Sequence, residues 1–160
     1  RTAVLLGYTG EFLDDIRLGA ELHDIGKIGT RESVLNKPGP LTPEEFRHIT
    51  EHTVLGERIL APLARDRPVV LRIARSHHER LDGTGFPDGL AGEAIPVEAR
   101  IVAVVDAFDA MTTNRAYRES FVPGSAFDEL RRCAGRQFEP AIVDAFCTAF
   151  PDPARLPIHA

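Results

Sequence analysis

The sequence predicts an all-α fold, a bundle of five or more helices built as a single domain over residues 1–160. Several segments repeat apolar residues three or four positions apart, which is the spacing of one helix face. Alternating strand patterns, internal repeats and low-complexity tracts do not stand out. With 160 residues and 43% hydrophobic composition, the chain can bury one sizeable core, which argues against intrinsic disorder.

The first half of the chain predicts two helices. Apolar residues recur along one face of residues 13–24, and Gly26 follows where that helix can end. A loop composition at 36–40 then precedes Thr-Pro-Glu-Glu at 42–45, which supplies an N-cap, a proline at the first helical position and a capping-box glutamate. A helix over 43–60 follows from this start.

Four further helices are predicted from the same apolar spacing, over residues 69–79, 96–113, 125–134 and 140–150. Between the first two lies segment 82–95, which contains four glycines and a proline. That content is too high for a regular element, so a shaped loop is expected there. Gly135 is the expected stop between the last two helices.

Charge and composition narrow the classes of function. A formal charge of -5 argues against binding a nucleic-acid polymer, because such binding needs a dense field of Lys and Arg. No apolar stretch is long enough to cross a bilayer, and no secretory leader is visible. Cys133 and Cys147 lack metal-finger spacing, so we expect reduced thiols and a cytoplasmic location. Because the chain begins at Arg1 and its only methionine is Met111, we expect an N-terminally truncated segment.

The histidines carry the strongest chemical signal. Four of the six stand beside a second metal-competent side chain or at a recurring helix position: His23, His52, His77 and His78. Asp24 directly follows the first of them, and the last two are adjacent. Neighbouring helical residues diverge by about 100 degrees, so adjacent ligands suit two metals or a bridging position better than one chelated ion. Asp106 interrupts an apolar run, where a carboxylate is costly to bury without a cation or donors.

Each signal also has a plainer interpretation. A lone His-Asp pair is more often a surface pair at a helix end, and Asp106 alone is more often a cap or an internal hydrogen-bonding group. His48 and His52, four residues apart, could form a separate two-histidine site, which would leave the other clusters unexplained. His159, in the C-terminal tail, is expected to be inert. A shared metal site explains the remaining signals together.

Three motifs resemble one family. His23-Asp24-Ile25-Gly26-Lys27 is similar to the HDxGK signature of HD-domain metal-dependent phosphohydrolases. The stretch from His77 to Pro87 resembles the HHExxDGxGYP motif of the HD-GYP subgroup, and residues 106–118 match its DxxDAxTxxRxYR pattern. The resemblance covers residues from about 13 to 146. Phe86 replaces the tyrosine of GYP, which removes a hydroxyl and keeps the aromatic face.

The resemblance implies an HD-domain-like bundle with two metal ions, iron or manganese, and leaves a third ion undecided. The implied ligands are His23, Asp24, His52, His77, His78 and Asp106. Mixed imidazole and carboxylate ligation suits those metals on independent grounds. The implied reaction is hydrolysis of cyclic di-GMP to linear pGpG, which some family members cleave further to GMP.

The same resemblance assigns further roles. Asp24 and Lys27 are assigned to catalysis, and Lys27, Arg115 and Arg118 to the phosphate oxygens of the substrate. A plain surface ion pair is the alternative for both arginines. Asp109, one helical turn after Asp106, is expected to orient a ligand histidine or to contact the nucleotide. Phe86 is assigned to the substrate site, where it packs against a guanine or, as the favoured alternative, against its own loop.

Two other functions compete with this one. A plain HD nucleotidase acting on mononucleotides would need the first ligands but has no use for the glycine-rich loop. A non-catalytic domain would bind cyclic di-GMP or dock a protein without turnover. The expected partners are cyclic di-GMP and, by family analogy, an upstream sensory or receiver domain and diguanylate cyclase domains.

Overall fold

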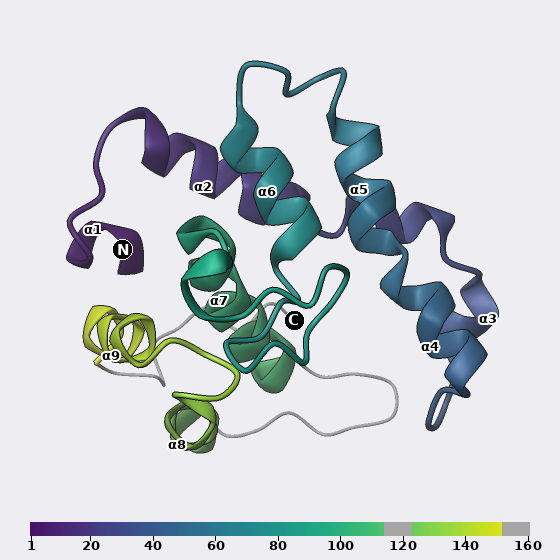
Figure 1. Ribbon diagram of the computed structural model, residues 1–160. Coiled ribbons are helices and arrows are strands. Elements are labelled where there is room, and N and C mark those ends of the chain that lie inside the picture. Colours follow the sequence, from purple (N-terminus) through teal and green to yellow (C-terminus); the bar gives the residue numbers. More distant parts are fainter. Residues whose placement is uncertain (114–122, 152–160) are drawn as a thin grey trace.

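The computed structural model describes residues 1–113 and 123–151, and within these ranges the chain is helical without a β-strand (Figure 1). The α-helices are α1 (Thr2–Leu5), α2 (Glu11–Leu22), α3 (Glu32–Leu35), α4 (Pro43–Thr50), α5 (His52–Leu60), α6 (Pro68–Ser76), α7 (Val97–Thr112), α8 (Pro123–Cys133) and α9 (Pro140–Ala149). Two 3₁₀ helices, η1 (Ile25–Gly29) and η2 (Gly92–Ala94), lie between them. The predicted all-α class is confirmed. No helix in the described ranges has the length and apolar content that crossing a membrane requires.

The helix predicted over residues 43–60 is two helices, α4 and α5, separated at Glu51. Its predicted start is confirmed: Thr42 accepts a hydrogen bond from the Glu45 backbone, and the Glu45 carboxylate accepts one from the Thr42 backbone. Lys37 also donates to that carboxylate, over 2.6 Å. This capping box fixes where α4 begins, and therefore where α5 delivers its first residue, His52.

The helix predicted over residues 13–24 ends at Leu22, so Asp24 stands at the start of η1 rather than in a last helical turn. The short helices α1 and α3 were not predicted. Each has four residues, which is too short to show an apolar repeat.

Helix α6 occupies the middle of one half of the fold, where it packs against both α2 and α5 (Figure 1). Helix α7 contacts α6 on one side and α8 and α9 on another. The side chains of Ile73 on α6 and Val104 on α7 are fully buried in the main core. Where α7, α8 and α9 meet, the rings of Phe108, Phe127 and Phe146 pack with centroids 5.1 to 5.8 Å apart. This packing fixes the direction in which α6 and α7 present their polar residues.

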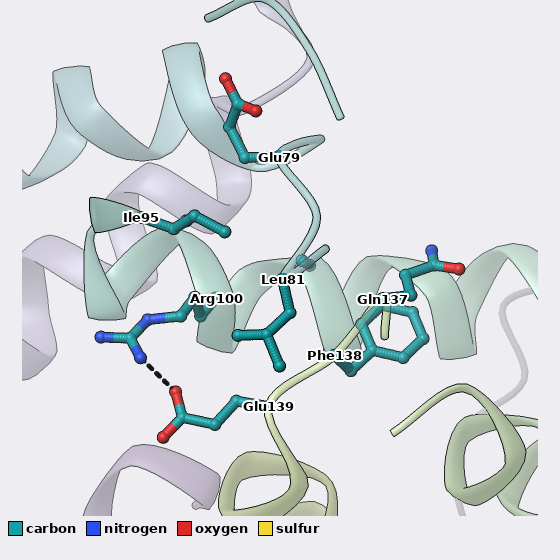
Figure 2. A pocket seen from close by; sticks show the side chains of 8 residues that line it. Glu79, Leu81, Ile95, Arg100, Gln137, Phe138 and Glu139 are labelled. Carbon is teal, nitrogen blue, oxygen red and sulfur yellow. Dashed lines mark hydrogen bonds and ion pairs between the residues drawn. The ribbon is translucent and has the colours of Figure 1, made fainter. Parts of the chain in front are cut away.

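The segment after α6 is tied down by polar contacts on two sides. Buried Glu79 accepts hydrogen bonds from the backbone N–H of Asp88, at 2.7 Å, and of Leu90, at 3.0 Å. On the other side, the backbone N–H groups of Leu81 and Asp82 donate to the carbonyls of Gln137 and Arg136, at 3.2 and 2.8 Å. Leu81 lies beside the ion pair of Arg100 on α7 with Glu139, which precedes α9 (Figure 2). The glycine-rich loop is therefore a shaped structure, as the sequence predicts.

Helix η1 lies directly on α5 because Gly26 has no side chain. A Cβ atom at Gly26 would lie 1.9 Å from the carbonyl oxygen of His52 and 2.6 Å from the backbone nitrogen of Gly56. Both neighbours are backbone atoms of a helix, so neither can move away alone. This contact places Asp24 beside His52.

We expect Gly26→Ala to lower the stability by about 3 kcal/mol, because the added methyl group forces η1 away from α5. The melting temperature should fall by roughly 6–12 °C in thermal unfolding followed by circular dichroism. Gly124→Ala is the matched control, since a Cβ there meets no atom within 4 Å. Equal melting temperatures for the two variants would contradict the close contact.

Candidate metal centre

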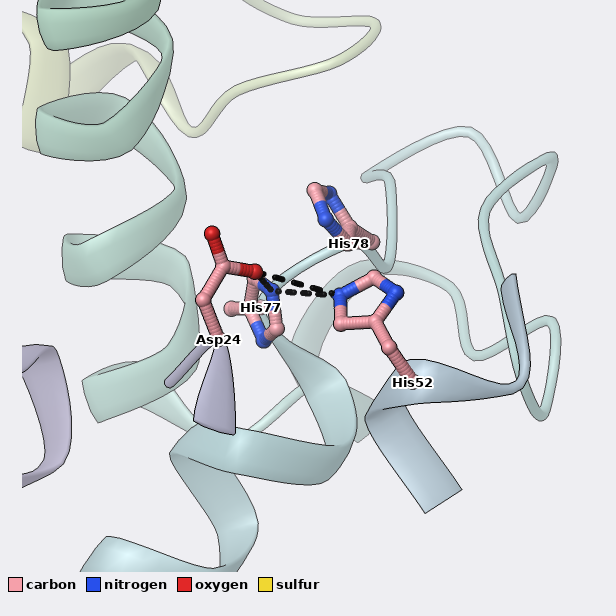
Figure 3. A group of neighbouring side chains, drawn as sticks. All are labelled: Asp24, His52, His77 and His78. Atoms are coloured by element: carbon pink, nitrogen blue, oxygen red, sulfur yellow. Dashed lines mark hydrogen bonds and ion pairs between the residues drawn. The ribbon is translucent and has the colours of Figure 1, made fainter. Parts of the chain in front are cut away.

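Five parts of the fold bring the predicted ligand residues together. His23 directly follows α2, Asp24 directly precedes η1, His52 is the first residue of α5, His77 and His78 directly follow α6, and Asp106 lies on α7. Figure 3 shows four of these side chains pointing toward one another. One ligand atom from each of Asp24, His52, His77 and His78 lies within 4.8 Å of all the others. We call the six residues the His/Asp cluster.

The carboxylate of Asp24 faces two sides of the His/Asp cluster. Its Oδ1 atom lies 3.3 Å from Nε2 of His52 and 3.8 Å from Nε2 of His77. Its Oδ2 atom lies 3.4 Å from Nε2 of His23 and accepts a hydrogen bond from Lys27 Nζ. Asp24 therefore has the position of a bridging carboxylate.

On the Oδ2 side, Asp106 completes the His/Asp cluster. Nε2 of His23 lies 3.6 Å from Oδ1 of Asp106, in addition to its contact with Asp24. These are ion-pair contacts rather than well-directed hydrogen bonds, because Nε2 has no hydrogen-bond partner in the described parts of the chain. The arrangement consists of two groups of ligand atoms that share Asp24.

Backbone carbonyls hold three of the imidazoles in place. The Nδ1 atoms of His23, His52 and His77 donate to the carbonyl oxygens of Ala20, Ile49 and Ile73, at 2.7, 2.6 and 3.0 Å. A carbonyl can only accept, so Nδ1 carries a proton in all three rings, and in a neutral ring the lone pair of Nε2 points into the His/Asp cluster. These hydrogen bonds set the tautomer that a metal ligand requires.

The electrostatics of the His/Asp cluster divide the histidines into two kinds. Burial lowers the pKa of His77 to about 3 and that of His78 to about 4, so both rings are neutral at pH 7. Burial also disfavours a charged His23, but the carboxylates of Asp106 and Asp24 outweigh it and raise the His23 pKa to about 10. His23 is therefore protonated at pH 7.

The two carboxylates respond to the positive charges of His23 and Lys27. Burial would raise the pKa of Asp24, but its contacts with protonated His23 and with Lys27 hold it far below its usual range. The pKa of Asp106 is lowered as well, where the contact with His23 outweighs burial. Both carboxylates are therefore ionised at neutral pH, as metal ligands must be.

The His/Asp cluster suits a divalent metal ion. Nε2 of His52 and Nε2 of His77 lie 3.4 Å apart, and each points a lone pair toward Oδ1 of Asp24. Three acceptors facing one another repel unless a cation lies between them. Among the described residues, Oδ1 of Asp24 and Nε2 of His23 are buried without a hydrogen-bond partner, which is the state of ligands that a metal would satisfy.

The predicted substrate residues have different positions. Lys27 is half-buried against Asp24, and the ring of Phe86 packs over His78 with centroids 4.8 Å apart. Asp109 is exposed on α7, and its side chain has no hydrogen-bond or ion-pair partner among the described residues. The predicted roles of Arg115 and Arg118 concern positions outside the described ranges.

Sequence reasoning missed two supporting residues. Its position after an apolar repeat predicts that Gly26 ends a helix, whereas its main effect is the contact with α5. Glu79 was given no role, although it is buried and holds the loop that carries Phe86. Glu79 directly follows two histidines at the end of an apolar helix, and this position was a signal that the sequence offered. The contact of Gly26 joins segments 26 residues apart, so the glycine of the HDxGK-like motif could be seen in the sequence but its contact with α5 could not.

Fold and site together define a helical domain with a candidate centre for divalent metals, and comparison with known proteins gives its family. Residues 1–142 match the family model described as HD domain. The chain is 43% identical over 150 residues to a cyclic di-GMP phosphodiesterase of Thermotoga maritima, covering 91% of this chain and 40% of that protein. It is 37% identical over 145 residues to 3'3'-cGAMP-specific phosphodiesterase 2 of Vibrio cholerae, covering 90% of this chain and 28% of the relative.

A solved structure agrees with the fold. The Bdellovibrio bacteriovorus protein Bd1817, described as an HDG"Y"P protein, superimposes with a TM-score of 0.75 at 21% identity. The match covers 94% of this chain and 48% of that one. The chain therefore belongs to the HD domain family, in its HD-GYP subgroup, as its motifs predict. It spans less than half the length of these relatives.

We expect Asp106→Asn to lower the His23 pKa from about 10 toward its ordinary value, because the charge that favours the imidazolium is lost. Imidazole signals of the chelator-treated protein, followed by NMR during a pH titration, measure this pKa. Asp109→Asn removes a carboxylate one turn along the same helix and should leave the titration unchanged. An unaltered His23 pKa in the Asp106 variant would rule out this ion pair as the cause.

Proposed function

We propose that this domain is a metal-dependent phosphodiesterase that hydrolyses cyclic di-GMP to linear pGpG. The observation that carries the proposal is the group of three facing acceptors, Nε2 of His52, Nε2 of His77 and Oδ1 of Asp24. A cation resolves their repulsion, and the backbone hydrogen bonds already hold both rings in the ligating tautomer. Chromatography of the products shows whether pGpG is cleaved further to GMP.

Two ions fit the two groups of ligand atoms. One group consists of His52, His77 and His78 with Oδ1 of Asp24, and the other of His23 and Asp106 with Oδ2 of Asp24. Imidazole nitrogens together with carboxylate oxygens suit iron and manganese, which are the metals we propose. Bound divalent ions supply Lewis acidity, which lowers the pKa of water and offsets the charge of a phosphodiester.

The chain's own residues then hold the substrate. Lys27 donates to Asp24 in the structure, and its ammonium group lies where it can contact a phosphate oxygen once the carboxylate coordinates metal. Phe86 covers the ring of His78 and limits access of water to that ligand. Arg115 and Arg118 are proposed to add positive charge for the phosphates, on the basis of their motif.

The names of the relatives support a cyclic dinucleotide as the substrate, one with two guanines and one with guanine and adenine. A mononucleotidase would have no use for the glycine-rich loop. In the structure, this loop places the ring of Phe86 on His78, which is a candidate ligand. The binding-only alternative is disfavoured because the described ligand side chains converge. Both alternatives are outcomes of the following experiment.

The protein is loaded anaerobically with ferrous iron or manganese and incubated with cyclic di-GMP, 3'3'-cGAMP or mononucleotides, and the products are separated by chromatography. We expect pGpG only in the presence of metal. His52→Asn should lower the rate at least about 100-fold, since it removes one of the three facing acceptor atoms that are proposed to bind the metal. His48→Gln is the control, because His48 lies outside the His/Asp cluster and its ring pairs with Arg31 and Glu51 in the described part of the chain.

Turnover of mononucleotides alone would support the nucleotidase instead. Tight binding of cyclic di-GMP without product would support a non-catalytic domain. Full activity of the His52 variant would contradict the proposed centre.

Metal binding should also release a proton from His23. This imidazole is charged at pH 7 because its pKa is about 10, and it must lose its proton to coordinate. Calorimetry in buffers with different ionisation enthalpies counts the protons released. We expect His23→Asn to release fewer protons than the unmodified protein, by about one, and the metal affinity of the unmodified protein to rise with pH below 10. Equal proton release would exclude His23 as a ligand.

A further inference from the structure

A pocket of about 250 Å³ opens beside the His/Asp cluster. Its wall includes His77, His78 and Asp106, and it continues over side chains that the proposed chemistry does not use. Its volume corresponds to about eight water molecules in the liquid, which is more than a phosphate group alone needs. We call it the base pocket and define it by His78, Arg80, Phe86, Asp106, Gln137 and Phe138.

Gln137 presents an unused amide to the base pocket. Its backbone is fixed, because its N–H donates to Cys133 over 2.9 Å and its carbonyl accepts from Leu81 at 3.2 Å. Its side-chain amide has no hydrogen-bond partner in the described ranges. Figure 2 shows this amide pointing away from the Arg100 and Glu139 pair. A half-buried amide with a fixed backbone can recognise a ligand at little entropic cost.

Arg80 presents unused N–H groups to the same pocket. Its Nε donates to Thr84 Oγ1 at 2.9 Å and to Asp82 at 3.3 Å, and Nη2 donates to Asp82 at 3.4 Å. These bonds hold the guanidinium plane and leave Nη1 without a partner among the described residues. Because Asp82 offsets the charge of Arg80, the pocket favours a neutral polar ligand over a second phosphate.

We propose that the base pocket holds one guanine base of the cyclic dinucleotide, with Gln137 and Arg80 recognising its polar edge. This inference rests on the proposed function. Guanine presents O6 and N7 as acceptors and N1–H as a donor, which match a guanidinium and an amide. Adenine has an amino group in place of O6, which would face the N–H groups of Arg80. Phe86 and Phe138 supply aromatic walls for a planar ring.

The two residues have separable contributions. An amide can pair with guanine or with adenine by reversing its oxygen and nitrogen, so Gln137 should strengthen binding of either base. A guanidinium only donates, so Arg80 should favour guanine. The structure therefore assigns affinity to Gln137 and base selection to Arg80.

The test compares kcat/KM for cyclic di-GMP, cyclic di-AMP and bis(p-nitrophenyl) phosphate, a diester without a nucleobase, on the metal-loaded protein. We expect Gln137→Leu to lower kcat/KM for cyclic di-GMP about tenfold. Turnover of the base-free diester should stay within about twofold, because no base-edge hydrogen bond is made there. Arg80→Gln should lower the preference for cyclic di-GMP over cyclic di-AMP. Arg136→Ala, on the same turn but outside the pocket, is the control.

Equal loss on both kinds of substrate in the Gln137 variant would overturn the inference, since the residue would then act through the metal centre. An unchanged kcat/KM for cyclic di-GMP would overturn it as well. In either case the unmodified protein still hydrolyses cyclic di-GMP and bis(p-nitrophenyl) phosphate. Failure of the unmodified protein to hydrolyse any diester would instead contradict the proposed function. Melting temperatures of all variants confirm that they are folded.

Discussion

The His/Asp cluster depends on one backbone contact. Because Gly26 carries no side chain, η1 lies against the first turn of α5, and the carbonyl of His52 takes the space of the missing Cβ. Asp24 precedes this contact by two residues and His52 is part of it, so the distance between their side chains is set by backbone atoms. Backbone of a helix is stiffer than side chains, which gives the Asp24 carboxylate a reproducible position.

The other residues of the His/Asp cluster are positioned by the core. Helix α6 is buried through residues such as Ile73, and the pair His77 and His78 follows at its end. The carbonyl of Ile73 also accepts the hydrogen bond from Nδ1 of His77. Ile73 thus contributes its side chain to the core and its carbonyl to the orientation of the His77 ring. Core packing and the geometry of the His/Asp cluster are coupled at this point of the chain.

Much of this arrangement could be predicted from the sequence. The capping box at Thr42 and Glu45 marks the start of α4, and the apolar spacing marks α6, α7 and α9. Local patterns could not show the break at Glu51 or the short helix η1, since both depend on how segments meet in space. The convergence of His23, Asp24 and Asp106 followed from motif resemblance, whereas the carbonyl partners of the imidazoles required coordinates.

The contacts of Asp24 and Asp106 also bear on which cations the centre can accept. The two carboxylates are already compensated by two positive charges, on the His23 imidazolium and the Lys27 ammonium. A cation that binds between these carboxylates would therefore have to replace the positive charges of His23 and Lys27. At the proposed centre, one divalent ion would supply as many positive charges as the His23 imidazolium and the Lys27 ammonium supply together, which one sodium or potassium ion would not.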